Sequence, residues 1–80
     1  MDGRIYEICR AAMFGQDSLS AWTDEELEDK QDFIDWALNV AGIMEQMKLD
    51  GYGEYTREEV ADFLSEVFDE ELQEYRQGGQ

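Results

Sequence analysis

The sequence predicts an all-α fold, a small three-helix bundle-like domain, and three observations predict it. Apolar side chains recur at spacings of three and four residues, the period of a helix with one buried face. Two segments open with a threonine followed three residues later by a glutamate, which signals a helix start. The 80-residue chain has no proline and no strand-like alternation of apolar and polar residues. We expect one helical domain over residues 1–76 and a disordered tail over residues 77–80.

The first predicted helix covers residues 3–14, where Ile5, Ile8 and Cys9 share one face. A polar loop is expected over residues 15–21 because that stretch opens with a glycine. Cys9 is the single cysteine, so no intrachain disulfide can form. We expect Cys9 to be a buried apolar residue of a protein from a reducing compartment.

The second predicted helix covers residues 24–48 and begins with a strong local signal. Thr23 is a good N-cap, and Glu26 completes a capping box with it. Trp22 and Leu27 flank this start at the spacing of a hydrophobic staple. The expected buried face consists of Phe33, Ile34, Ala37, Val40, Ala41 and Met44.

Three glycines mark interruptions of the helical pattern. Gly42 lies inside the second predicted helix, where glycine costs about 1 kcal/mol relative to alanine. We expect it either to kink the helix or to allow close packing against the first helix. Gly51 and Gly53 mark the turn that follows.

The third predicted helix covers residues 57–76 and repeats the same entry signal. Thr56 is the expected N-cap, Glu59 completes the capping box, and Tyr55 with Val60 forms the staple. The expected core-facing stripe consists of Val60, Phe63, Leu64, Val67, Phe68, Leu72 and Tyr75.

The turn between the second and third predicted helices has a degenerate EF-hand-like pattern over residues 48–59. Gly53 occupies the sixth position, where the calcium loop needs glycine, and Glu59 occupies the twelfth. Lys48 replaces the ligand at the first position and would repel calcium, and Tyr52 replaces the ligand at the fifth. We therefore expect an ordinary interhelical turn, or a hinge of this shape, and no metal site.

The formal net charge is −15, and the acids are concentrated after the first predicted helix. Residues 1–23 hold three acids and two bases, whereas residues 24–80 hold eighteen acids and four bases. On helical wheels these acids form two strips opposite the apolar faces. One strip consists of Glu25, Glu28, Asp32 and Asp35. The other strip consists of Glu58, Asp62, Glu66, Asp69, Glu70 and Glu74.

Local stability does not explain these strips, because acids four residues apart on a helix repel by about 0.2–0.5 kcal/mol per pair. A basic partner, general solubility or high-salt adaptation, and a cation site are the three candidate explanations. We favour a basic partner. Acids four residues apart lie about 6 Å apart along a helix, and each DNA strand carries one charge per roughly 3.4 Å of duplex rise. Two staggered strips would approximate the charge density of a nucleic-acid groove edge.

In its size, its clustered negative charge and its lack of catalytic residues, the chain resembles small acidic phage-type proteins that mimic DNA. Anti-restriction and anti-CRISPR inhibitors are examples of this class. The resemblance covers the second and third predicted helices and involves no sequence motif. It implies a phage- or mobile-element-encoded inhibitor that occupies the Lys/Arg channel of a nuclease, CRISPR or restriction complex.

Composition also limits the other function classes. There is no histidine, no serine with a plausible base and no glycine-rich phosphate loop, so we expect neither an enzyme nor a cofactor. No leader-like segment and no apolar run of membrane-spanning length occurs, which predicts a cytoplasmic protein. The negative charge would repel anionic membranes and nucleic acid, so neither is expected as a direct partner.

Aromatic residues give a second kind of candidate contact. Tyr52 and Tyr55 lie next to the acidic start of the third predicted helix, and we expect them to anchor the basic partner. The alternative is that each covers the edge of the core. The alternative function is a helical interaction or assembly module that forms a homo-oligomer through Trp36, Ile43 and Met47. The protein is accordingly expected to be a monomer or a homodimer.

Overall fold

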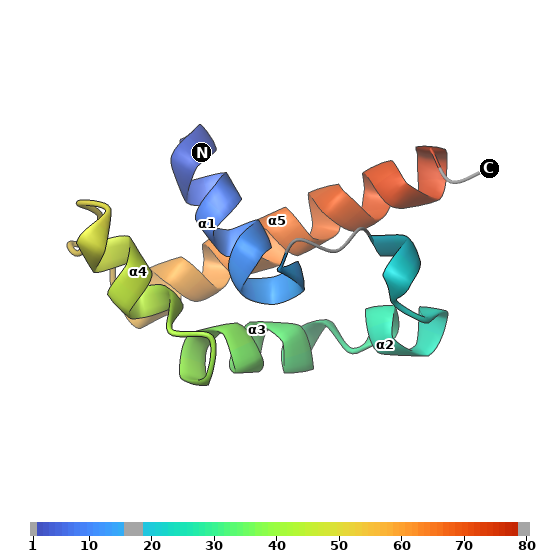
Figure 1. Ribbon diagram of the computed structural model, residues 1–80, viewed down its shortest axis with the longest axis horizontal. Coiled ribbons are helices and arrows are strands. Elements are labelled where there is room, and N and C mark those ends of the chain that lie inside the picture. The colour runs from blue at the N-terminus through green and yellow to red at the C-terminus, as the bar shows by residue number, and fades with distance from the viewer. Residues whose placement is uncertain (1, 16–18, 79–80) are drawn as a thin grey trace.

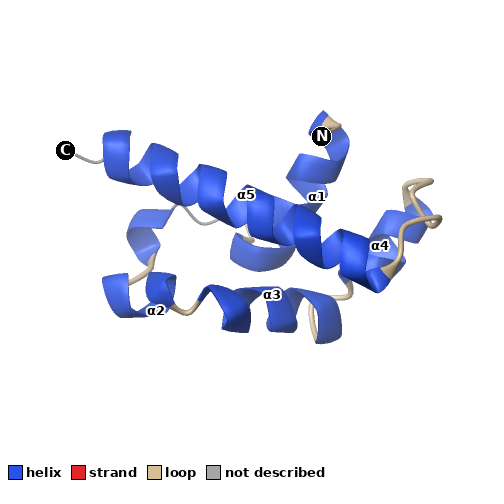
Figure 2. Ribbon diagram, turned by 180° about the vertical axis from the view of Figure 1, so that it is seen from behind, coloured by secondary structure: helices blue, strands red, loops and turns tan. Residues whose placement is uncertain are grey.

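The computed structural model describes residues 2–15 and 19–78, whose arrangement is shown in Figure 1. The elements are α1 (Gly3–Phe14), the 3-10 turn η1 (Leu19–Ala21), α2 (Asp24–Glu28), α3 (Lys30–Asn39), α4 (Ile43–Leu49) and α5 (Arg57–Gly78). Figure 2 shows helices joined by loops, and no strand occurs among the described residues. The all-α class is therefore confirmed. The described ranges contain five α-helices rather than three.

The first helix has the predicted bounds. Asp2 caps it, because its carboxylate accepts the backbone N–H of Arg4 at 2.8 Å. Gly15 follows with a φ of 65°, which glycine adopts at little cost, and its N–H donates to the carbonyl of Ala11. The predicted loop over residues 15–21 falls partly outside the described residues, since residues 16–18 are not among them.

The predicted second helix is divided into α2, α3 and α4. Thr23 caps α2 as predicted, since its Oγ1 accepts the backbone N–H of Glu26 at 3.1 Å. The first break falls at Asp29, whose backbone (φ −91°, ψ 55°) leaves the helical region. The N–H of Asp29 donates to the carbonyl of Glu26 at 3.2 Å, which closes α2 after five residues. Neither glycine nor proline marks this break, so the sequence pattern does not reveal it.

The second break separates α3 from α4. The N–H groups of Val40 and Ala41 both donate to the carbonyl of Trp36, at 2.8 and 3.0 Å. Gly42 then adopts φ 73° and ψ 32°, a left-handed conformation that favours glycine. The chain changes direction here, and α4 follows a new axis (Figure 1). The kink considered at Gly42 is therefore a complete helix break.

This break reverses the predicted burial of the residues around it. A single helix would bury Val40 and Ala41 and place Ile43 and Met47 at the border of its apolar face. Instead Val40 is 67% exposed and Ala41 is exposed. Ile43 and Met47 are each only 1% exposed. The prediction that Ile43 and Met47 contact a partner is wrong, because α4 directs both side chains into the core.

Helix α5 is the longest element, and α1 crosses it while α3 runs alongside (Figure 1). Viewed from behind in Figure 2, α5 lies in front of α1. The core lies where these three helices meet α4 and the turn η1. Its buried residues are Ile5, Ile8, Cys9, Met13, Phe14, Leu19, Leu27, Ile34, Ala37, Ile43, Met47, Val60, Leu64, Val67 and Phe68.

An aromatic cluster joins α1, α3 and α5. The ring centroid of Phe14 lies 5.2 Å from that of Phe33 and 5.7 Å from that of Phe68. Phe33 and Phe68 are 5.5 Å apart, and Trp22 contacts Phe33 edge-on at 5.2 Å. Ring pairs at these distances add about 0.5–1.5 kcal/mol beyond their burial. The cluster therefore holds the start of α3 against both neighbouring helices.

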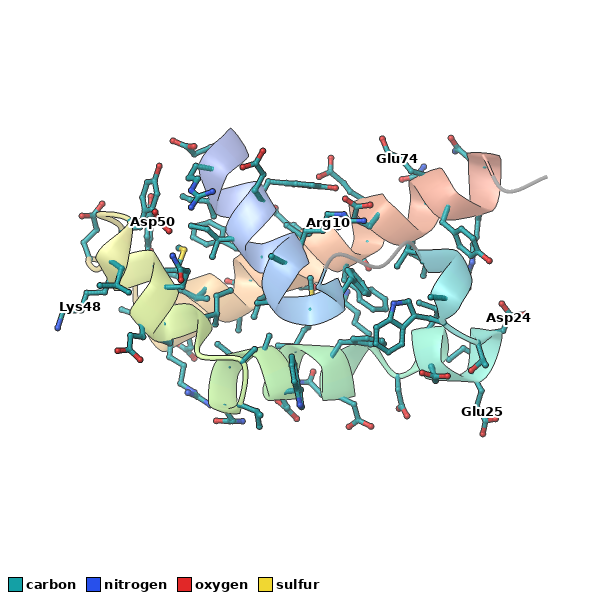
Figure 3. The ribbon with its side chains drawn as sticks, viewed as in Figure 1. Arg10, Asp24, Glu25, Lys48, Asp50 and Glu74 are labelled. Atoms are coloured by element: carbon teal, nitrogen blue, oxygen red, sulfur yellow. The ribbon has the colours of Figure 1, made fainter. Side chains whose placement is uncertain are left out.

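The turn before α5 has the predicted capping box, but it does not have the arrangement of an EF-hand-like turn. Oγ1 of Thr56 accepts the N–H of Glu59 at 3.2 Å, and the Glu59 carboxylate accepts the N–H of Thr56 at 3.1 Å. The carboxylate of Asp50 is engaged by Arg4 of α1 at 3.2 Å. In Figure 3, Lys48 points away from the body of the molecule. The EF-hand-like turn is thus not confirmed.

Helix α5 is longer than predicted. It continues through Gly78, so two residues of the predicted tail over residues 77–80 are helical. Residues 79–80 of that tail lie outside the described residues.

Candidate functional site

Five acids on α5 follow one another at four-residue spacing, and we call them the acid ladder. They are Glu58, Asp62, Glu66, Glu70 and Glu74, and all five are exposed. Successive members rise about 6 Å along the helix axis, so the ladder spans about 24 Å. Asp69 is also exposed and completes the strip predicted on this helix. The structure therefore places the six residues of this strip on one continuous helix.

Three basic side chains, those of Arg4, Arg10 and Lys30, form ion pairs with acids outside the ladder. Nε of Arg10 lies 3.1 Å from Oε1 of Glu71, and Nη2 of Arg4 lies 3.2 Å from Oδ1 of Asp50. Nζ of Lys30 lies 2.9 Å from Oδ1 of Asp69. None of the ion pairs within the described ranges involves a member of the acid ladder. The ladder is thus an uncompensated row of negative charge.

The second predicted strip is divided by the break between α2 and α3. All four of its members are exposed: Glu25, Glu28, Asp32 and Asp35. Nε2 of Gln31 donates to the carboxylate of Asp35 at 3.0 Å. In Figure 3, Glu25 points outward below α2, whereas Glu74 projects from the opposite edge of the molecule, above α5. These two acids therefore point apart, whereas Asp69 in the middle of α5 lies against Lys30 at the start of α3.

The two tyrosines predicted to anchor a partner are half-buried and pack on their own chain. Their ring centroids are 6.4 Å apart, and the ring of Tyr55 meets Phe63 of α5 edge-on at 5.1 Å. The hydroxyl of Tyr52 donates to the carboxylate of Asp2 at 3.4 Å. Both rings therefore cover the edge of the core, and part of each remains exposed beside the first turn of α5.

A feature absent from the sequence predictions is an open pocket of about 440 Å³ between α1 and the α2–α3 segment, which we call the α1–α3 groove. Its apolar walls include Ala11, Ala12, Phe14, Trp22, Phe33 and Trp36. Its acidic rim consists of Glu26, Asp29 and Asp32. The chain's two tryptophans both line it, and Trp36 is 51% exposed. The paired alanines near the end of α1 are the only local signal, since their small side chains leave the space open.

Two polar features of the groove are electrostatically unfavourable in the isolated chain. The neighbouring Asp29 carboxylate raises the pKa of Asp32 above its usual range, with a smaller contribution from Asp35. Nε1 of Trp22 is buried and has no hydrogen-bond acceptor among the described residues. A buried donor without an acceptor costs about 1–3 kcal/mol. Glu26 is better accommodated, because its carboxylate accepts the Thr23 hydroxyl at 3.0 Å.

The ionisable groups nearer the core are buried or bound to other side chains. Cys9 is buried as predicted, and burial raises the pKa of its thiol to about 12, which suppresses thiolate chemistry. The hydroxyl of Tyr6 donates to Glu71 at 2.8 Å, and burial together with this contact raises the pKa of Tyr6. Glu71 also pairs with Arg10, so this cluster ties α1 to α5.

Comparison with protein-family models, with curated proteins and with solved structures gave no match for this chain. Among the described helices, none combines the length and apolar character needed to cross a membrane. No group of three or more His, Cys, Asp or Glu side chains in the described ranges is arranged to hold a metal ion. The acid ladder and the α1–α3 groove are the two candidate functional surfaces of the described residues.

Proposed function

We propose that this protein is a non-enzymatic inhibitor that binds a basic protein surface through the acid ladder of α5. The surface would be the nucleic-acid channel of a nuclease, CRISPR or restriction complex, and the protein would act in the cytoplasm as a DNA mimic. The single observation that carries the proposal is the row of five exposed acids without a paired cation on the described chain.

The spacing of the ladder supports this proposal. Its charges recur about every 6 Å along a straight helix, whereas a DNA strand carries one charge per roughly 3.4 Å of duplex rise. The row also turns by about 40° at each step, because four residues exceed one turn of 3.6, so it winds about 160° around α5 from Glu58 to Glu74. It presents charge at about half the linear density of one DNA strand. Lysine and arginine side chains that line a nucleic-acid channel are long enough to adjust to this difference. Attraction of this kind accelerates association and weakens as salt is added.

We assign this role to the ladder alone, because the other strip is divided between α2 and α3. Glu25 and Glu74 point to opposite edges of the molecule, so these two acids would not enter the same channel. The tyrosines of the preceding turn are partly exposed beside the start of α5 and would contact the rim of the channel. The assembly alternative has less support, because two of its three contact residues, Ile43 and Met47, lie in the core.

The test is a pull-down with the immobilised protein from a bacterial lysate at about 0.1 M and 0.5 M salt, between which screening increases strongly. We expect capture of a basic nucleic-acid-binding protein at the lower salt and its release by added duplex DNA. The ladder variant Asp62→Lys, Glu66→Lys, Glu70→Lys should abolish capture while circular dichroism shows unchanged helicity.

The matched control is Glu25→Lys, Glu28→Lys, Asp35→Lys, which makes the same change in net charge on the other strip. This control should retain most of the binding. Equal loss in both variants would show that only the net charge matters. Capture that persists in the ladder variant, or that ignores DNA, would contradict the mimic proposal.

A further inference from the structure

The α1–α3 groove has the size and lining of a binding site. Its volume of about 440 Å³ falls within the range of roughly 300–1,000 Å³ found for ligand pockets. Its walls are mainly apolar and aromatic, and they include Trp36, a residue that is 51% exposed. Tryptophan is enriched among the residues that dominate binding energy.

The charge of the groove is entirely of one sign. Three acids form its rim, and no lysine or arginine is among the residues that line it. The raised pKa of Asp32 beside Asp29 shows that these carboxylates repel one another in the free protein. A cation placed at this rim would relieve that repulsion.

We propose that the α1–α3 groove binds a basic amphipathic peptide segment of a partner protein. One apolar side chain of the segment packs against the aromatic wall formed by Trp22, Phe33 and Trp36. Its lysine or arginine side chains pair with the rim carboxylates, and a cation above an exposed indole face gains a further cation–π contact. This inference goes beyond the proposed function, because the groove shares no residue with the acid ladder.

Charge complementarity selects this occupant over other apolar ones. A second copy of the chain would bring a further formal charge of −15 to an acidic rim. An anionic lipid surface would be repelled by the same carboxylates. A purely apolar ligand would leave the repulsion between Asp29 and Asp32 in place. Only a segment that is both apolar and basic satisfies the wall and the rim together.

The experiment uses intrinsic fluorescence, because both tryptophans of the chain line the groove and report directly on its occupancy. The probe is a synthetic 14-residue amphipathic helical peptide of leucine and lysine, without tryptophan. Two further peptides serve as controls: one with every leucine replaced by serine, and one with every lysine replaced by glutamate. We expect saturable binding of the leucine–lysine peptide with a shift of the tryptophan emission, and at least about tenfold weaker binding of both controls.

Variants of equal charge then locate the binding. The rim variant Glu26→Gln, Asp29→Asn, Asp32→Asn removes three charges from the groove. The matched variant Asp62→Asn, Glu66→Gln, Glu70→Gln removes three charges from the acid ladder. We expect the rim variant to lose about tenfold in affinity and the ladder variant to change by less than about threefold. Trp36→Ala should also weaken binding about tenfold, and Trp22 remains as the reporter.

Several results would overturn the proposal. Equal weakening in the rim and ladder variants would mean that the net charge of the protein, and not the groove, determines the affinity for the peptide. If the serine–lysine peptide bound as tightly as the leucine–lysine peptide does, the apolar wall would not contribute to binding. An emission shift that grows with protein concentration alone, with a dimer in sedimentation, would assign the groove to a second copy. Each result is independent of the pull-down, so failure of one proposal leaves the other in place.

Discussion

The ammonium group of Lys30 lies 2.9 Å from Oδ1 and 3.0 Å from Oδ2 of Asp69, and this ion pair joins the first residue of α3 to the middle of α5. It removes Asp69 from the set of acids free to meet a partner. Both side chains remain substantially exposed, at 36% and 64%. Pairs of this kind contribute about 0–1 kcal/mol. The pair therefore orients α3 on α5 more than it stabilises the fold.

We expect Lys30→Met to lower the free energy of unfolding by no more than about 1 kcal/mol, because solvent screens the exposed pair. The measurement is urea denaturation at low salt and at about 1 M salt, where the loss should largely disappear. Asp69→Asn and the double variant complete a cycle that separates the pair from the overall change in charge. A coupling above 2 kcal/mol that persists at high salt would show that the pair is a main support of the fold.

Gly42 permits the left-handed turn between α3 and α4, and Gly42→Ala tests this role. A Cβ at this position would meet no atom within 4 Å, so the cost is conformational only. Placing a side chain at φ 73° is expected to lower the free energy of unfolding by about 1–2 kcal/mol. The measurement is chemical denaturation followed by circular dichroism.

The control is Gly3→Ala, where a Cβ also has open space but the backbone is helical. This variant should gain up to about 1 kcal/mol in stability, since alanine is the better helix former. If both variants stabilise the protein, the chain runs as one helix through Gly42 and the break described above is wrong.

The reversed burial around Gly42 predicts unequal effects of truncation. Met47→Ala should lower the free energy of unfolding by about 2–5 kcal/mol, because Met47 is 1% exposed and a cavity would remain. Val40→Ala should change it by less than about 0.5 kcal/mol, because Val40 is 67% exposed. Thermal unfolding of the two variants checks the difference. The opposite order of effects would restore the single long helix that the sequence pattern predicts.

The stability conferred by Asp50 is expected to depend on pH. A hydrogen bond from Gln46 at 2.7 Å, and then the guanidinium of Arg4, lower the pKa of Asp50. The unfolded state therefore takes up a proton at higher pH than the folded state. The contribution is present above the unfolded pKa of about 3.9 and is lost as the pH falls through the lower folded value.

Asp50→Asn should accordingly be less stable than the wild type at pH 7, and the difference should close on acidification. Denaturation midpoints between about pH 7 and pH 2.5 measure this closure. Glu66→Gln is the control, since it removes a repelled charge from the acid ladder and should not destabilise the protein at neutral pH. A destabilisation by Asp50→Asn that stays constant with pH would show that packing, not charge, is responsible.

The sequence by itself determined the all-α class, the bounds of α1, and the caps at Thr23 and Thr56. These features depend on side chains within a few residues of one another, so local rules are sufficient. It also determined the order in which the acids follow one another around α5, because a long regular helix preserves the 3.6-residue period.

Only the tertiary structure decided where the segment from Asp24 to Leu49 breaks and what each part contacts. The break at Asp29 carries no glycine or proline, and it lets α2 and α3 follow different directions while Phe33 packs on Phe14 and Phe68. The α1–α3 groove and the opposite orientations of Glu25 and Glu74 follow from this arrangement of the helices. They depend on contacts between residues far apart in the chain, which no local pattern of side chains encodes.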